Sequence, residues 1–291
     1  MSYITEDLMK KTTENVMLKM ETCGAGWLRS WVGESQLPVN CESKKSYSGI
    51  NLFILLGEEK SSGKWGTYKA WSRLEKQIAK GEKGTTIIYF KMLPTKNLDK
   101  KGNPESIPMM KCYTVFNESQ TVGYEMEDTK NNGSTFAQAD ADQWIKNSGA
   151  VIDYNNISAF YNPNADKIGM PPMTSFFKTD DATAEQNFYG TLFHELTHWT
   201  GHTSRENRLV KNSSREDYAK EELIAELGAC FQSVAFGIEP AEVNADHTKY
   251  LNGWLKALKN DNKFIFQAAA KANQAIQFLN ELQKVEEEKV A

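Results

Sequence analysis

Five consecutive residues, from His194 to His198, carry the most specific chemistry of this chain, and they read His-Glu-Leu-Thr-His. Residues four positions apart lie on one face of an α-helix, so the imidazoles of His194 and His198 can bind one metal ion. Zinc is the usual ion, held at roughly 2.0–2.1 Å from the ring nitrogens. Glu195 lies between the histidines, where its carboxylate can take a proton from a zinc-bound water. The motif therefore predicts Zn2+ as cofactor and hydrolysis of peptide bonds, with Glu195 as the general base.

The residues on either side of this motif are typical of a helix. Thr183 and Gln186 have the spacing of a capping box, and Gly201 follows the motif as a helix stop. Apolar residues recur at helical spacing and leave both histidines outside their stripe: Phe188, Leu192, Leu196 and Trp199. These flanks favour a metal site over the alternative, a surface or core helix that carries two histidines by chance.

The third metal ligand is predicted on a second helix, downstream of the motif. Ser213 and Glu216 have the spacing of another capping box, and on the helix that follows, Glu222 and Glu226 share a face. We predict Glu222 as the ligand and Glu226 as the carboxylate that supports a ligand histidine from behind. Glu221 and Glu226 remain alternatives for the ligand. A solvated acidic helix face is the alternative for all three glutamates.

The composition is that of a folded protein without a membrane segment. Hydrophobic residues make up 40% of the 291 residues and charged residues 25%, which is ordinary for globular proteins. The longest uninterrupted aliphatic or aromatic run, Leu52 to Leu56, is far shorter than the roughly 18 residues of a membrane span. The first twenty residues have mixed charge and no apolar stretch, and the four cysteines are widely spaced. We therefore expect no secretory signal, no disulfide framework and a cytoplasmic protein.

The net charge of -4 conceals a basic stretch in the first half of the chain. From Asn40 to Phe116, fourteen Lys or Arg stand against seven Asp or Glu, and aromatic residues are interleaved with the lysines. Basic surfaces with exposed rings bind single-stranded nucleic acid through phosphates and stacked bases. The predicted contacts are Lys44, Lys45, Lys83 and Lys91 for charge, and Tyr47, Trp65 and Tyr68 for stacking. Asn51 is predicted to bond a phosphate or to cap a turn, with the turn favoured. Lysines that only solvate the surface and rings that fill a core are the alternative.

The order of predicted elements indicates an α+β fold in two domains. The first, residues 1–124, is mixed α/β and is the predicted DNA-binding domain; residues 125–135 are polar and form a linker; residues 136–291 form the peptidase domain. The first domain is expected to hold a helix over 67–80 with Trp71, Leu74 and Ile78 inward, and strands over 85–92 and 110–116 joined by a polar loop over 94–108. The second is expected to hold helices over 139–148, 247–259 and 264–286, and strands over 159–162 and 167–170.

The chain resembles the ArdC-type antirestriction proteins over nearly its whole length. In the first half the resemblance lies in Leu37 to Asn40, Tyr47 to Asn51, Trp65 to Tyr68 and Lys80 to Gly84. In the second half it lies in Ala159 to Pro163, His194 to His202, Glu221 to Leu227 and the spacing of Trp254, Leu255, Leu258 and Asp261. The resemblance implies a single-stranded-DNA-binding domain joined to a zincin-like peptidase domain similar to SprT and Spartan proteases. It also implies a bacterial protein of conjugative plasmids and related mobile elements that protects entering DNA from restriction.

Two classes of function follow from these observations. The first is a zinc peptidase that acts on proteins at or near DNA, with a donor for the oxyanion among Arg208, Tyr218, His247 and Tyr250. The second is a non-enzymatic protein that coats single-stranded DNA, in which the metal site is a structural clasp. The carboxylate of Glu195 favours the enzyme, because a clasp requires the two histidines but no base between them.

Overall fold

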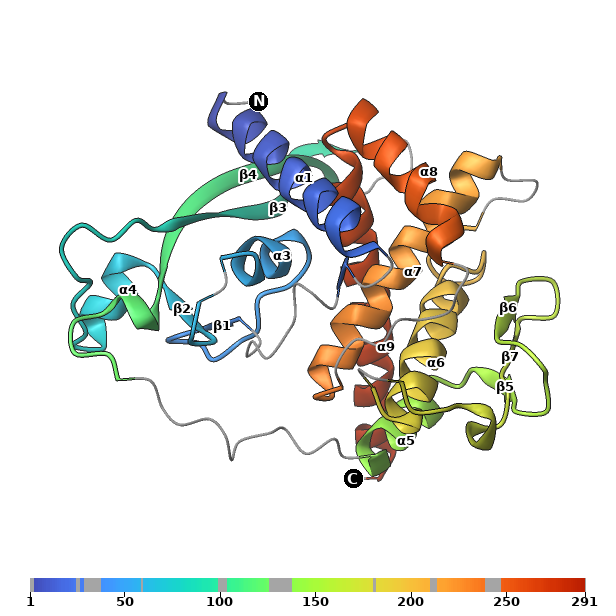
Figure 1. The fold of residues 1–291 in the computed structure, drawn as a ribbon. Coiled ribbons are helices and arrows are strands. Elements are labelled where there is room, and N and C mark those ends of the chain that lie inside the picture. Colours follow the sequence, from blue (N-terminus) through green and yellow to red (C-terminus); the bar gives the residue numbers. More distant parts are fainter. Residues whose placement is uncertain are drawn as a thin grey trace. The chain divides into compact units, whose positions relative to one another are not determined.

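The computed structural model describes residues 3–24, 27–28, 38–58, 60–98, 104–125, 138–179, 182–209, 214–238 and 247–290. These residues form two compact units (Figure 1). Unit 1 comprises Met1–Leu8 and Ser35–Glu127, and unit 2 comprises Met9–Glu34 and Asp128–Ala291. The α+β fold class expected from the sequence is confirmed.

Unit 1 is built on a four-stranded sheet in the order β1-β2-β4-β3. The strands are β1 (Val39–Asn40), β2 (Lys64–Gly66), β3 (Thr85–Leu98) and β4 (Pro104–Asn117). The short β1 pairs parallel with β2, whereas β2 and β3 both pair antiparallel with β4. Helix α3 (Ile50–Leu56) packs on this sheet, and a small core of Leu55, Trp65, Ile87 and Val115 lies between them.

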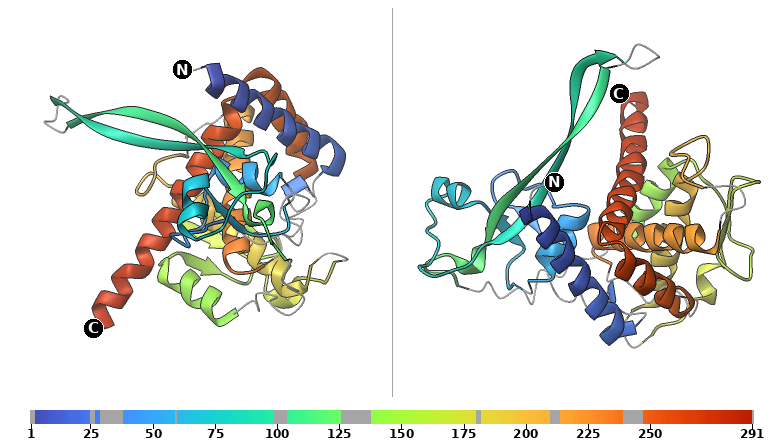
Figure 2. Two further views of the ribbon diagram at one scale, coloured as in Figure 1. Left: turned by 90° about the vertical axis from the view of Figure 1, so that its left-hand side faces the viewer. Right: turned by 90° about the horizontal axis from the view of Figure 1, so that it is seen from above.

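Two predicted elements of unit 1 are wrong in their extent. The strands β3 and β4 continue through most of the predicted 94–108 loop and form one long twisted ribbon (Figure 2). The predicted 67–80 helix is only α4 (Tyr68–Arg73), because Glu75 adopts a φ of 59°, which a helix cannot continue through. Leu74 consequently faces solvent, with 42% of its surface exposed, while Trp71 and Ile78 are buried as predicted.

Unit 2 combines a three-stranded sheet with a group of long helices. The sheet has the order β5-β7-β6, with β5 (Val151–Asp153), β6 (Phe160–Asn162) and β7 (Lys167–Gly169), so β6 lies at an edge. The helices are α5 (Gln138–Asn147), α6 (Ala184–Thr200), α7 (Arg215–Ala235), α8 (His247–Asn260) and α9 (Phe264–Val290). The predicted apolar stripe of the motif helix is confirmed, since Phe188, Leu192, Leu196 and Trp199 all lie in the core of this unit.

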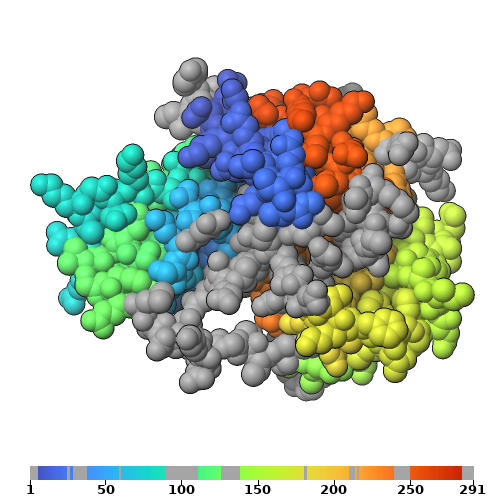
Figure 3. All heavy atoms as spheres, in the orientation of Figure 1, coloured from blue at the N-terminus to red at the C-terminus, as the bar shows by residue number. Residues whose placement is uncertain are grey.

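Helix α1 (Tyr3–Cys23) contributes most of its length to unit 2. Thr13 Oγ1 donates a hydrogen bond to the carbonyl of Asn262, and Lys259 Nζ lies 3.4 Å from Glu21 Oε1. Atoms of α1 and α8 lie side by side on the face shown in Figure 3. Val16 and Met20 are fully buried, as expected of an amphipathic helix that covers a core.

The compact units differ from the predicted domain boundaries in one respect. Residues 9–34 belong to unit 2, whereas the sequence places all of residues 1–124 in the first domain. The contacts of α1 with α8 and the segment after it explain the difference, because no periodicity within α1 reveals which core it covers. The predicted division at 124 and 136 stays a prediction, and its linker lies almost wholly outside the described residues. None of the described helices is both long enough and apolar enough to pass through a bilayer.

Candidate functional site

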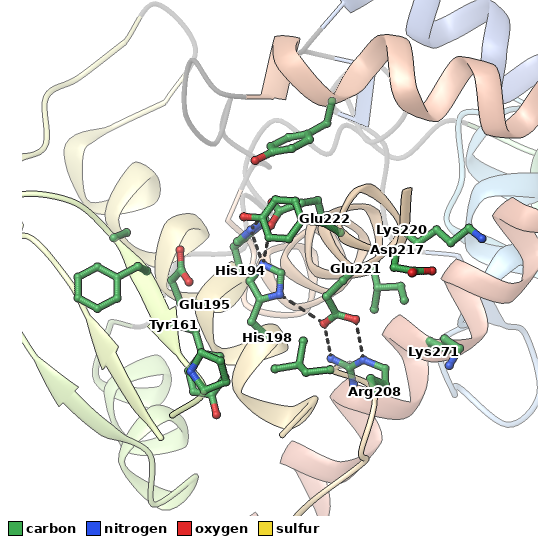
Figure 4. Close-up of a pocket in the computed structure, with 17 residues that line it drawn as sticks. Tyr161, His194, Glu195, His198, Arg208, Asp217, Lys220, Glu221, Glu222 and Lys271 are labelled. Carbon is green, nitrogen blue, oxygen red and sulfur yellow. Dashed lines mark hydrogen bonds and ion pairs between the residues drawn. The ribbon is translucent and has the colours of Figure 1, made fainter. Parts of the chain in front are cut away.

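Helix α6 carries the first half of the site. Its start is fixed by the predicted capping box, which is confirmed: the Thr183 hydroxyl accepts from the Gln186 backbone, and the Gln186 side chain accepts from the Thr183 N–H. The helix ends at Thr200, with Gly201 as its C-terminal cap. His194, Glu195 and His198 lie within this helix and are largely buried (Figure 4).

Three donor atoms of the predicted ligands meet in one place. One nitrogen from each of His194 and His198 and one oxygen of Glu222 lie within 4.8 Å of one another. The two Nε2 atoms are 3.1 Å apart, and the Glu222 oxygens lie 3.5 Å from His194 Nε2 and 3.4 Å from His198 Nε2. Ligand atoms of a tetrahedral zinc are about 3.4 Å apart when each bond is roughly 2.0–2.1 Å long. The spacing of the donors therefore fits a zinc ion.

A second carboxylate lies behind each histidine. Glu226 Oε2 is 3.5 Å from His194 Nδ1, and Glu221 Oε1 is 3.3 Å from His198 Nδ1. Carboxylates in this position fix the ring so that Nε2 faces a metal, which is the usual arrangement of metal-binding histidines. The sequence proposed Glu226 for this role but offered Glu221 only as an alternative ligand. The structure places Glu221 behind His198 instead, because it is one residue before Glu222 and so points about 100° away around the helix.

The electrostatics of this cluster suit a cation. Burial lowers the pKa of His194, but hydrogen bonds to Glu222 and Glu226 outweigh it and raise the pKa to about 10. Burial likewise lowers the pKa of His198, but Glu221 and Glu222 raise it to about 9. Four carboxylates meet in the cluster: that of Glu195 and those of three glutamates of α7, Glu221, Glu222 and Glu226. Arg208 offsets only part of this charge, because it pairs with Glu206 as well as with Glu221, and a divalent ion would supply two further positive charges in place of protons on the histidines.

Helix α7 brings its glutamates to the histidines through a close helix crossing. A Cβ added to Gly228 would lie 2.5 Å from Thr197 Oγ1, so the two helices touch at that glycine. The start of α7 differs from the prediction by one residue: Ser214 is the N-cap and pairs with Asp217, rather than Ser213 with Glu216. Two adjacent serines, each followed three residues later by an acidic residue, make the two registers indistinguishable in sequence.

The site opens into a pocket of about 530 Å³. Phe160 and Tyr161 of the edge strand β6 line one side of it, and Tyr218 and Ile224 of α7 line another. Figure 4 shows Glu195 beside Tyr161, with His194, His198 and Glu222 adjoining it in the pocket. Burial raises the pKa of Glu195, and the charges of His194 and His198, with a smaller effect of a hydrogen bond from the Tyr161 backbone, partly counter this. The pocket is thus lined by the Glu195 carboxylate together with the three candidate metal-binding side chains.

The structure narrows the predicted oxyanion donors. Arg208 is unsuitable, because its guanidinium already donates to Glu221, Thr200 Oγ1 and the carbonyl of Thr197. The side chain of His247 lies outside the described residues. Tyr218 and Tyr250 both line the pocket, with ring centroids 5.7 Å apart. Burial and the charge of Glu222 raise the pKa of Tyr218, with hydrogen bonds to Tyr250 and Glu222 adding to the effect, so its phenol stays protonated.

The predicted nucleic-acid contacts in unit 1 differ in how far they are exposed. Lys44, Lys45, Tyr68 and Lys83 are exposed, and Tyr47 is half-buried. The prediction that Trp65 stacks on a base is wrong. Only 1% of this residue is exposed, because its ring fills the core under α3. Asn51 neither caps a turn nor faces solvent, since its amide donates to the carbonyl of Ile88 and accepts from the Ile88 N–H. The side chain of Lys91 lies outside the described residues.

Comparison with known proteins accounts for both units. Residues 6–116 match the N-terminal domain of anti-restriction factor ArdC, and residues 139–271 match a zincin-like metallopeptidase. The metal-free crystal structure of the antirestriction ArdC protein from plasmid R388 is 35% identical, with a TM-score of 0.74, and the match covers 95% of this chain and 97% of that one. The chain belongs to the ArdC-type antirestriction family. A second structure of the R388 ArdC protein, with Mn(II) bound, matches with a TM-score of 0.73.

Other relatives are similar to this chain over different fractions of their own length. Two Escherichia coli proteins named DNA primase TraC are 34% and 31% identical over 89% and 96% of this chain. The chain spans only 19% and 27% of the length of those primases. The uncharacterized protein y4eC of Sinorhizobium fredii is 28% identical over 94% of this chain and 92% of its own length.

Membership in this family indicates which metal ion the site binds. The zincin-like domain implies zinc, and the structure supplies His194, His198 and Glu222 as a matching set of donors. The predicted family resemblance is confirmed, and so is the pairing of an ArdC N-terminal domain with a zincin-like domain.

Proposed function

We propose that this protein is a zinc-dependent peptidase that binds single-stranded DNA and acts on proteins at or near DNA in the bacterial cytoplasm, as an antirestriction factor of a mobile element. The observation that carries the peptidase is the position of Glu195. Its buried carboxylate adjoins the three donor atoms and opens into a pocket that a peptide can enter. A purely structural metal site has no use for a base or for an accessible pocket.

Different residues of the site would bind the metal ion, transfer the proton and align the peptide. His194, His198 and Glu222 would hold the ion, which when bound supplies Lewis-acid activation of water and carbonyl groups. Glu195 accepts a proton from the attacking water and returns it to the leaving amine. The edge strand β6 lines the pocket, and an extended peptide can pair with such an edge through backbone hydrogen bonds. This pairing would lay the scissile bond across the site.

Tyr218 is our candidate for stabilising the oxyanion. Its phenol stays protonated, it lies one helical turn before Glu222, and 48% of the residue is exposed toward the pocket and solvent. A protonated hydroxyl beside a metal ligand can donate to an oxygen that gains charge in the transition state. Tyr250, which packs against the Tyr218 ring, is the alternative donor.

The Glu195→Gln variant tests the enzyme directly. It removes the base while keeping the size of the side chain, so we expect zinc content and thermal stability like those of the wild type and a loss of cleavage of at least about 100-fold. The assay follows self-cleavage and cleavage of a DNA-bound protein, with and without single-stranded DNA. If wild type and Glu195→Gln behave alike in every condition, the metal site is a structural clasp and the protein acts by binding alone.

Exposed basic and aromatic groups of unit 1 support the proposed binding of single-stranded DNA. Tyr68 is 53% exposed, and its ring meets that of Phe116 at an angle of 74°, so the ring is both anchored and accessible to a base. We expect Tyr68→Ala in the full-length protein to weaken binding to an unstructured oligonucleotide by about 1–3 kcal/mol, while Tyr68→Phe retains most of it. Lys45→Gln should instead reduce the slope of affinity against salt concentration. Equal affinity of the wild type for single and double strands would contradict the proposal.

A further inference from the structure

The segment that follows the motif helix folds back onto the end of that helix. The backbone N–H groups of Arg208 and Leu209 both donate to the carbonyl of Gly201, at 2.9 and 3.0 Å. The Arg208 side chain, of which only 4% is exposed, thereby reaches the last turn of α6. Its guanidinium donates to the carbonyl of Thr197 at 2.7 Å and to Thr200 Oγ1 at 2.9 Å. A cation at this end of a helix also interacts favourably with the helix dipole.

Gly201 leaves the space that this arrangement needs. A Cβ at position 201 would lie 3.0 Å from Arg208 Nη2 and 3.1 Å from Leu209 Cγ. The backbone of Gly201 has an ordinary negative φ of -74°, so its conformation does not require glycine. The glycine instead allows the guanidinium to lie directly against the helix end.

From this position Arg208 holds Glu221, and Glu221 faces His198. Arg208 Nη2 and Nε lie 3.0 and 3.2 Å from the two oxygens of Glu221, and Glu221 Oε1 lies 3.3 Å from His198 Nδ1 (Figure 4). Only 12% of the Glu221 side chain and 11% of the His198 side chain are exposed. A fork of two hydrogen bonds fixes the plane of a carboxylate as well as its position.

We propose that Arg208 and Glu221 form a relay that orients His198 for metal binding and keeps Glu221 itself out of the set of ligands. With Glu221 accepting a hydrogen bond from Nδ1–H, the lone pair of His198 lies on Nε2 and faces Glu222 and His194. Because Arg208 occupies both oxygens of Glu221, this carboxylate does not turn toward the ion in place of its neighbour Glu222. Arg208 and Glu221 are thus positioning residues, and the inference rests on the metal site of the proposed function.

Metal affinity measures the relay without relying on peptidase activity. Zn2+ is titrated into the metal-free full-length protein against a chromophoric chelator, for the wild type, Glu221→Gln, Arg208→Lys and the double variant. Glu216→Gln is the matched control, because it removes the same charge from an exposed position on the same helix. We expect Glu221→Gln to weaken zinc binding about 10- to 100-fold, and Glu216→Gln to change it less than about threefold.

The double variant separates the relay from a merely structural arginine. If Arg208 acts through Glu221, Arg208→Lys weakens zinc binding in the wild type but adds little once residue 221 is Gln. Additive effects, or a Glu221→Gln protein that binds zinc as tightly as the wild type, would overturn the relay. Thermal melting of each metal-free variant identifies any that fails to fold, and the Glu221→Gln result then decides alone. A wild type that binds no zinc would overturn the relay and the proposed peptidase together.

Discussion

Two regions of this molecule bury carboxylates, and they balance the charge in different ways. In unit 1, Glu118 is 7% exposed and is surrounded by Lys64, Lys76 and the hydroxyl of Ser62, at 3.3, 2.5 and 2.8 Å. One negative charge there has two positive neighbours within the chain. In unit 2, Glu195 and three glutamates of α7 (Glu221, Glu222 and Glu226) lie around two imidazoles. Of these four carboxylates Arg208 contacts Glu221, and it shares its charge with Glu206.

This difference in charge balance indicates a structural role for the Glu118 cluster and a cation-binding role for the cluster around His194 and His198. Burial raises the pKa of Glu118, but hydrogen bonds from Lys76 and Ser62 lower it by more, so this carboxylate is charged and satisfied by its own fold. Such a cluster needs nothing from outside and holds neighbouring segments together. The cluster in unit 2 gathers more negative charge than Arg208 offsets and lies at a pocket, which is the arrangement of a site that takes up a cation.

The largest expected effect is on metal binding. Glu222→Ala removes a charged ligand, so we expect zinc affinity to fall by at least about 100-fold, and protein purified without added metal to lose most of its zinc. Elemental analysis measures the content, with the His194→Ala, His198→Ala double variant as the reference for a destroyed site. Full zinc in Glu222→Ala would move the third ligand to Glu221 or Glu226.

A smaller effect is expected in the balanced cluster. Glu118→Gln leaves two lysines without their carboxylate, and because their side chains are 39% and 44% exposed, solvent screens part of the loss. We expect the free energy of unfolding of unit 1 to fall by about 1–2 kcal/mol, measured by chemical denaturation. Zinc content should be unchanged. A loss of zinc in this variant would show that the two clusters are coupled and would break the comparison.

The smallest expected effect is on the stability that one ion pair of unit 2 contributes to the folded state. Asp166 pairs with Arg205, which also donates to the hydroxyl of Tyr161 on β6. A hydrogen bond from Arg205 lowers the pKa of Asp166 to about 2 from its usual 3.8. The folded state therefore gains stability above pH 3.8, and this gain disappears as the pH falls through about 2.

Because 38% of the Asp166 side chain is exposed, we expect the gain to be only about 1 kcal/mol after solvent screening. Asp166→Asn should lower the free energy of unfolding by this amount at pH 6. The gap between the two proteins should narrow as the pH falls below 4. A gap that does not change with pH would assign the effect to packing rather than to the ion pair.

The sequence predicted the parts of the site that depend on local geometry. Helical spacing places His194 and His198 on one face whatever surrounds them, and the capping box of Thr183 needs only the adjacent residues. It could not identify Glu221 and Arg208 as partners, because their contact depends on how the segment after Gly201 folds back. Nor could it separate buried rings from exposed ones: Trp65 and Tyr68 lie three residues apart in a basic stretch, yet only Tyr68 is exposed. Trp65 is buried because it lies on β2, between the sheet and α3, whereas Tyr68 begins the next helix outside this core.

The amide of Asn51 has a consequence for association between molecules. The strand β3 lies at an edge of its sheet, and Asn51 bonds both backbone groups of Ile88 that face away from β4. A side chain thus takes the place of the next strand near the start of β3. A strand from another molecule cannot add to the sheet at Ile88 unless it first displaces this amide. One asparagine thereby blocks edge-to-edge pairing of two molecules at the base of the hairpin.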